Sequence, residues 1–145
     1  MLKGGRFRAI VLALSICLVA MLGVLFYPGR ATAQQVDPLQ QATVWRGSIY
    51  QGNAAYPATI TILTRSADRI TGEIQLVLGD GAQNILVFQG NVIGADTVVW
   101  ITDRKTGNVT SPGLYFGHIV GDRLTGVWQV PSVGQYDRFE VSRVS

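Results

Sequence analysis

The segment Tyr115–Trp128 constrains the fold of this 145-residue chain most strongly, because its turn fixes its register. Only the pair Gly121-Asp122 separates its two apolar-polar alternating halves, and a glycine-first pair suits a type II′ hairpin turn. Such a turn places Gly117 opposite Gly126, and the end residues Tyr115 and Trp128 opposite each other, on one apolar face. The segment therefore predicts a β-hairpin with one apolar and one mixed face.

Apolar-polar alternation continues from Thr43 onward and is broken about every ten positions by Gly, Asp, Asn or Pro. No long stretch there shows a helical period of apolar residues, so we predict no substantial helix in this part. The predicted strands are Thr43–Gln51, Tyr56–Thr64, Arg69–Leu78, Asn84–Val92, Thr97–Asp103, Gly113–Val120, Arg123–Val130 and Gln135–Arg143.

Short connections between these strands require sequential antiparallel pairing, which is a meander. Closure of the meander removes exposed sheet edges. The fold class predicted is therefore all-β, a single eight-stranded antiparallel meander closed into a small barrel, with a two-sheet sandwich as the alternative. In its last strand, Phe139 and Val141 are expected to point inward.

Two finer details of register follow from the same pattern. The apolar faces of the second and third strands match only if an odd-length loop of three or five residues joins them. Around Gly94, a three-residue loop places Trp100 opposite Gly90, whereas a two-residue loop places Val99 there. We favour Trp100, because a large ring can cover the exposed backbone of a strand glycine.

Glycine recurs in the middle of the predicted strands between two bulky residues. Glycine is unfavourable in a strand interior, so its repetition on the apolar face needs a physical reason. We favour the interpretation that these glycines let the strands bend until the barrel closes. The alternative is that they leave the interior unfilled for a ligand. The positions are Gly47, Gly72, Gly90, Gly117 and Gly126.

The N-terminal region has the features of an export signal. Three basic residues precede the uncharged run Ala9–Tyr27, and the A-x-A cleavage pattern Ala31–Ala33 follows it. Residues 1–33 are predicted to be a signal peptide or, if uncleaved, a hydrophobic anchor helix in the cytoplasmic membrane. The predicted location is extracytoplasmic, meaning periplasmic or secreted, or anchored to that membrane. A polar linker, 34–42, then precedes the barrel domain, 43–145.

Charge and cysteine content change once residues 1–33 are set aside. Four of the twelve basic residues lie in that region, and none of the nine acidic residues does. The rest of the chain therefore has a formal net charge of 8 − 9 = −1. The remainder gives no reason to expect nucleic acid as a partner. A membrane is a predicted partner only through residues 9–27 if the signal is uncleaved. The one cysteine, Cys17, also lies there, so a disulfide in the barrel is excluded.

Residues suited to catalysis or metal binding are few and scattered. His118, the one histidine, is predicted on the mixed hairpin face, and Glu73 and Glu140 on outward faces. The aspartates at turns are explained by hydrogen bonds to local backbone. We therefore predict no catalytic, cofactor-binding or metal-binding residue. The longest irregular connection, Arg104–Pro112, is a candidate lid or partner-contact loop, although an ordinary solvated loop has the same composition.

Aromatic residues are the most suggestive candidates for a binding site. Three tryptophans and one tyrosine fall on the predicted inward face, where they could form core or an apolar wall at a barrel opening. The candidate ligand-binding residues are Trp45, Trp100, Tyr115 and Trp128.

The pattern from Trp45 to Val144 resembles small exported barrels of the avidin-like and lipocalin-like kind. The shared features are Trp45-x-Gly47, the segment Ile70–Ile74, Val98–Trp100, Phe116-Gly117 and the tryptophan Trp128 of the penultimate strand. Avidin-like proteins place Asn and Ser after the first tryptophan and in the first loop to hold biotin, and Arg46, Gly47 and Ser48 do not reproduce that set. The resemblance implies this architecture and a binding role, but not biotin binding.

Three hypotheses of function follow. The first is a non-catalytic extracytoplasmic barrel that binds a small apolar ligand or a protein partner. The second is a partner-binding or inhibitor module of the cell envelope with a filled barrel, acting through an outer face or the Arg104–Pro112 loop. The third is an enzyme of the isomerase or cyclase class, in which His118 or Glu73 would be the first residues to substitute.

Overall fold

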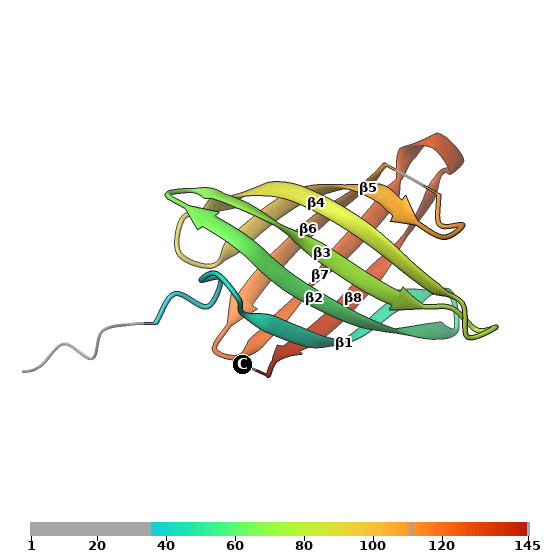
Figure 1. Cartoon of the computed structure of the whole chain (residues 1–145), viewed down its shortest axis with the longest axis horizontal. Coiled ribbons are helices and arrows are strands. Elements are labelled where there is room, and N and C mark those ends of the chain that lie inside the picture. The colour runs from blue at the N-terminus through green and yellow to red at the C-terminus, as the bar shows by residue number, and fades with distance from the viewer. Residues whose placement is uncertain (1–35, 111, 145) are drawn as a thin grey trace, which may run out of the picture. The chain divides into compact units, whose positions relative to one another are not determined.

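The computed structural model describes residues 36–110 and 112–144, which form a closed antiparallel barrel (Figure 1). Its elements in chain order are β1 (Val44–Gln51), β2 (Ala54–Ser66), β3 (Arg69–Val77), β4 (Gln83–Ile93), β5 (Thr97–Thr106), β6 (Gly113–Val120), β7 (Arg123–Val130), the short 3₁₀ helix η1 (Pro131–Val133) and β8 (Gln135–Arg143).

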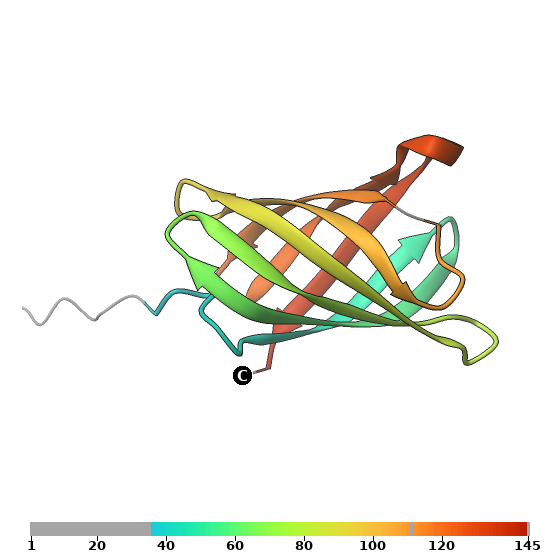
Figure 2. The ribbon, with the colours of Figure 1, turned by 45° about the horizontal axis from the view of Figure 1, so that its top comes forward.

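Each strand pairs with the next, and β1 also pairs with β8, so the sheet closes on itself (Figure 2). At this seam Trp45 lies opposite Arg143 and Ile49 opposite Phe139. The predicted all-β meander and its closure are confirmed, and the sandwich alternative is wrong. Closure satisfies the backbone groups that two edge strands would otherwise leave exposed.

The predicted hairpin register is confirmed residue by residue. Tyr115 faces Trp128 and Gly117 faces Gly126 across β6 and β7. The ring predicted to cover Gly90 is indeed Trp100, which lies opposite it in β5. Turn chemistry thus predicted the first pairing, and the preference for a large ring over a strand glycine predicted the second.

The predicted odd-length loop between the second and third strands is wrong. Ser66 pairs with Arg69, so the turn has two residues, and Ala67 in it adopts a positive φ of 51°. The register instead shifts between Ile62 and Thr64, and the intervening Leu63 is exposed. This β-bulge inserts one extra residue, which brings the apolar faces of β2 and β3 into agreement.

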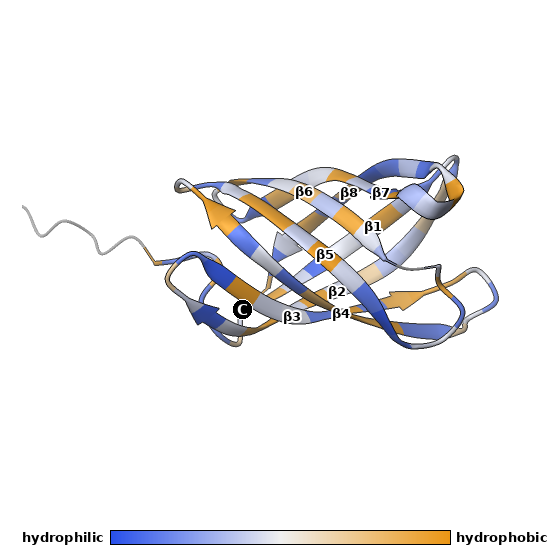
Figure 3. Ribbon diagram, turned by 90° about the horizontal axis from the view of Figure 1, so that it is seen from above, coloured by the Kyte–Doolittle hydropathy of each residue, from blue (hydrophilic) through white to orange (hydrophobic). Residues whose placement is uncertain are grey.

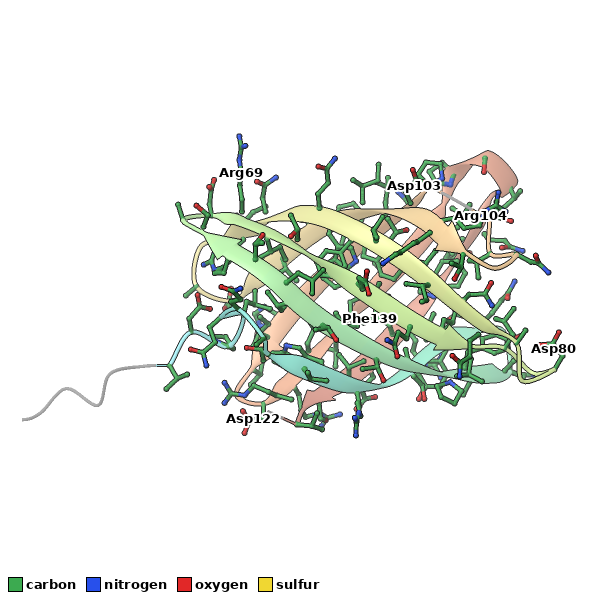
Figure 4. All side chains as sticks on the ribbon, viewed as in Figure 1. Arg69, Asp80, Asp103, Arg104, Asp122 and Phe139 are labelled. Carbon is green, nitrogen blue, oxygen red and sulfur yellow. The ribbon has the colours of Figure 1, made fainter. Side chains whose placement is uncertain are left out.

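Alternation along each strand separates the interior from the outer surface, as the alternating colours of Figure 3 show. Phe139 and Val141 point inward as predicted, at 1% exposure each. Among the described residues the buried polar side chains are Thr43, Asn84 and Thr102, and none of them is charged. Figure 4 places Phe139 within the barrel, with charged residues such as Arg69 and Asp122 on its outside.

The segment 36–43 forms turns at the end of the barrel where β2 meets β3. Leu39 is 2% exposed and belongs to the core, and the backbone of Ala42 and Thr43 hydrogen-bonds to Ile62. The described part of the predicted linker thus contributes an apolar side chain to the barrel interior.

The predicted signal or anchor, residues 1–33, lies outside the described residues, as do its apolar run 9–27 and Cys17. Within 36–110 and 112–144, no helix is long and apolar enough to span a bilayer.

Candidate functional site

The middle of the barrel is filled by four aromatic rings. Trp100 stacks on Tyr115 with ring centres 5.3 Å apart and planes 8° from parallel. Phe139 meets both rings edge-on, at 5.5 Å and 5.7 Å, and Phe88 lies 5.5 Å from Trp100. We call Phe88, Trp100, Tyr115 and Phe139 the ring cluster. Such tilted and stacked pairs add favourable contacts to the burial of apolar surface.

The strand glycines make room for this cluster. A Cβ atom on Gly126 would overlap the backbone oxygen of Phe116 and lie 2.7 Å from the Phe139 ring. The same atom on Gly90 would collide with Trp100, and on Gly72 with Phe88. Neighbouring backbone and rings thus fill the space that these glycines leave. The interpretation that the glycines hold space open for a ligand is wrong at these positions.

The β1–β2, β3–β4, β5–β6 and β7–β8 connections lie together at one end of the barrel (Figure 1). The residues that line the open space come from this end. A cavity of about 260 Å³ opens there, and we call it the mouth cavity. Its lining residues are Ile49, Gln51, Tyr56, Leu76, Leu78, Leu86, Thr102, Asn108, Val109, Thr110, Gly113, Tyr115, Trp128, Val130 and Gln135.

The mouth cavity is lined about equally by apolar and by neutral polar groups, and none of its described lining residues is charged. The Nε1–H of Trp128 donates a hydrogen bond of 2.9 Å to the backbone oxygen of Tyr50, which fixes that indole in the wall. Tyr115 forms part of the wall deeper in the barrel, where burial raises the pKa of its hydroxyl. Apolar side chains combined with neutral polar groups are found together in small-molecule sites.

The Asn84 side chain holds the β5–β6 loop in place, and part of this loop lines the mouth cavity. Its side-chain oxygen accepts hydrogen bonds from the backbone N–H groups of Asn108 and Val109, at 2.6 Å and 3.3 Å. At the end of the loop, Thr102 Oγ1 donates to the Gly113 carbonyl and accepts from the Gly113 N–H. The hydrogen bonds between Thr102 and Gly113 are buried, and those that Asn84 accepts are partly buried.

Replacing Asn84 with alanine should release this loop. The change leaves two backbone N–H groups without their acceptor, at a cost of about 1–3 kcal/mol in the free energy of unfolding. Hydrogen exchange at the Asn108 and Val109 amides should accelerate strongly, while exchange at the β6–β7 hairpin should rise only with global stability. Unchanged protection at both loop amides would contradict the assigned role of Asn84.

The predicted loop Arg104–Pro112 is partly a strand, since β5 continues to Thr106. Of the rest of this segment, the described residues 107–110 and 112 are irregular, and Asn108, Val109 and Thr110 line the cavity. Because Asn84 holds the loop, its described part is anchored to the barrel wall.

The four predicted binding residues separate into two groups. Tyr115 and Trp128 line the mouth cavity, and Tyr115 also belongs to the ring cluster. Trp100 belongs to the ring cluster without lining the cavity, and Trp45 is a fully buried core residue beside the seam. The buried Nε1 atoms of Trp45 and Trp100 have no hydrogen-bond partner within residues 36–110 and 112–144.

Sequence reasoning missed Asn84 and Thr102. Asn84 lies on the inward face of β4 together with Leu86 and Phe88. Thr102 lies on the inward face of β5 together with Val98 and Trp100. A polar side chain at an inward position usually has a hydrogen-bonding partner. That signal was present, but the partners come from a loop whose path only the structure supplies.

The residues considered for catalysis lie apart on the outer surface. His118 Nδ1 is 3.7 Å from an Asp96 carboxylate oxygen, and both side chains are more than half exposed. Glu73 pairs with Lys105, and Glu140 pairs with Arg123. Within the described chain, no three His, Cys, Asp or Glu residues are grouped so that they could hold a metal ion.

The fold is similar to that of a solved avidin-like barrel. The crystal structure of apo shwanavidin superposes with a TM-score of 0.50 over 72% of this chain and 96% of that chain, at 14% sequence identity. No protein-family model and no curated protein sequence matches the chain. The resemblance to avidin-like barrels is thus confirmed for the fold.

Alkaline pH should destabilise the barrel through Tyr115. Burial raises the pKa of its hydroxyl above the usual value of 10.0, so the folded state keeps the proton that the unfolded chain loses. The free energy of unfolding should therefore fall as pH rises above about 10, with a contribution of up to about 1.4 kcal/mol per pH unit. Urea unfolding at about pH 9 and about pH 11 measures this fall. Tyr115→Phe should show a smaller fall, and an equal fall in both proteins would contradict the prediction.

Proposed function

We propose that this protein is a non-catalytic extracytoplasmic barrel that binds a small apolar ligand in the mouth cavity. The observation that carries the proposal is the position of the cavity: the barrel is filled at its middle and hollow at one end, where apolar walls meet neutral polar groups. A filled middle supplies a rigid floor, and a rigid site loses less free energy on ordering a ligand.

The size of the cavity limits the ligand. At about 260 Å³ it lies just below the range of about 300–1,000 Å³ found for pockets that hold drug-sized molecules. A molecule of one or two rings, or a branched chain of similar volume, matches this space. The avidin-like fold is compatible with such a role, although fold by itself does not define function.

The extracytoplasmic location rests on the sequence of residues 1–33, with its basic start, its apolar run and its A-x-A pattern. The non-catalytic assignment rests on the scatter of the titratable side chains over the outer surface. The partner-binding and enzyme hypotheses have no support among the described residues comparable to the mouth cavity.

Ethylbenzene is a suitable first probe, because it is apolar and small enough for the cavity. Its titration should saturate a shift of the Trp128 indole N–H signal in ¹H–¹⁵N spectra, since Trp128 lines the wall. Val130→Trp should remove the shift by filling the cavity. Gln129→Trp is the matched control, because Gln129 is next to Val130 in β7 but its own side chain points outward and is exposed.

Two results would contradict the proposed function. One is an unchanged Trp128 signal up to the solubility limit of ethylbenzene and of larger apolar probes. The other is equal binding by wild type and by a folded Val130→Trp variant, which would place the probe elsewhere.

A further inference from the structure

Tyr115 is held with its ring directed toward the mouth cavity. Its ring is fixed between the stacked Trp100 and the edge of Phe139. Gly113 is the next inward residue of β6 on the side of the mouth, and a Cβ atom built there would lie 3.2 Å from Cε2 of Tyr115. The far edge of the tyrosine ring therefore covers Gly113, a cavity-lining residue.

The hydroxyl of Tyr115 is an unused hydrogen-bonding group. The side chain is only 5% exposed, and it has no hydrogen-bond partner among the described residues. Trp128 Nε1 and Thr102 Oγ1 are already hydrogen-bonded, to Tyr50 and to Gly113. The remaining polar side chains of the wall are more exposed than Tyr115; they are Gln51, Tyr56, Asn108, Thr110 and Gln135. The hydroxyl oxygen is not one of the fully buried atoms without a partner in the described chain, so it is accessible from the cavity. A ligand that supplies an acceptor there can replace the hydrogen bond that the hydroxyl otherwise makes to water.

The absence of charge in the lining restricts the ligand further. A carboxylate or an ammonium group entering the mouth cavity would lose water and meet no opposite charge among the lining residues. A neutral carbonyl oxygen loses far less on desolvation and can accept a hydrogen bond from a phenol.

We infer that the mouth cavity selects an uncharged molecule with an apolar body and one carbonyl-type acceptor, and that Tyr115 determines this specificity by donating its hydroxyl proton to the acceptor. This inference rests on the proposed function, because it names the chemical class of the ligand for that same site.

Three matched probes test it. Acetophenone carries a neutral acceptor, ethylbenzene lacks one, and benzoate is an anion of similar shape. Dissociation constants come from the Trp128 indole signal in wild type and in Tyr115→Phe, which keeps the stacked ring and removes only the hydroxyl. Dispersed amide spectra of the variant serve as the control for folding.

Tyr115→Phe should weaken acetophenone binding about two- to tenfold, as expected for one lost neutral hydrogen bond. The same variant should leave ethylbenzene binding within about twofold or strengthen it. Benzoate should bind wild type at least about tenfold more weakly than acetophenone, since its charge is not compensated.

The outcomes separate this inference from the proposed function. If ethylbenzene binds in the mouth cavity but Tyr115→Phe leaves acetophenone affinity unchanged, the role of Tyr115 is overturned while the site stands. Benzoate binding as tight as acetophenone would overturn the selection for uncharged ligands. If none of the three probes binds, both the inference and the proposed function fail for ligands of this size.

Discussion

Replacing Gly47 with alanine should destabilise the barrel by about 3 kcal/mol, near the upper end of typical overpacking effects. Gly47 lies in β1 opposite Val141 of β8, at the seam that closes the sheet. A Cβ atom there would overlap the backbone oxygen of Glu140 and lie 2.7 Å from the Cα atom of Val141. Because both contacts are with backbone, no side-chain rotation can relieve them, and the two strands would have to separate.

The measurement is the free energy of unfolding in urea, followed by circular dichroism. Gly79→Ala is the matched control, since a Cβ atom on Gly79 would meet nothing within 4 Å. That variant should differ from wild type by less than about 0.5 kcal/mol, as most surface substitutions do. Equal stability of Gly47→Ala and Gly79→Ala would show that the seam is looser than the structure indicates.

Phe139→Ala should cost about 3–5 kcal/mol in the free energy of unfolding, the range for large-to-small substitutions of buried aromatic residues. Phe139 is 1% exposed, contacts Trp100 and Tyr115 edge-on, and fills the space beside Gly117 and Gly126. Since those glycines carry no side chain, the surroundings cannot close the resulting hole without moving backbone. Unfolding in guanidinium, monitored by tryptophan emission, gives the change.

Tyr136→Ala provides the comparison for this second substitution, because it removes an aromatic side chain from the same strand. Tyr136 is 81% exposed, so its loss should change stability by less than about 0.5 kcal/mol. Similar destabilisation by Phe139→Ala and Tyr136→Ala would contradict the ring cluster as the centre of the core.

Much of the fold could be predicted from the chain, because local chemistry determines it. The Gly121-Asp122 turn fixes the β6–β7 register, and alternation assigns Phe139 and Val141 to the interior. The β-bulge at Leu63 was not predicted. An extra residue in a strand and an extra residue in a loop correct the register equally well, so the alternating pattern cannot distinguish them.

The candidate site could be predicted only in part. Tyr115 and Trp128 were identified because large aromatic residues on an inward face suit both a core and a binding wall. Whether such a residue belongs to the core or to the cavity wall depends on its position along the barrel axis. Trp45 and Trp100 do not line the cavity. Asn84 acts on a loop distant in sequence, and a single chain carries no signal for that pairing.

The seam between β1 and β8 also bears on how the molecule assembles. It joins the first strand to the last, whereas every other pairing is a local hairpin between successive strands. Bringing such distant segments together carries the largest loss of chain entropy. The hairpins should therefore form first, and the β1–β8 pairing that closes the barrel should form last. Until that step, β1 and β8 each leave one edge of the sheet unpaired. The chain should therefore be most prone to aggregation before the barrel closes.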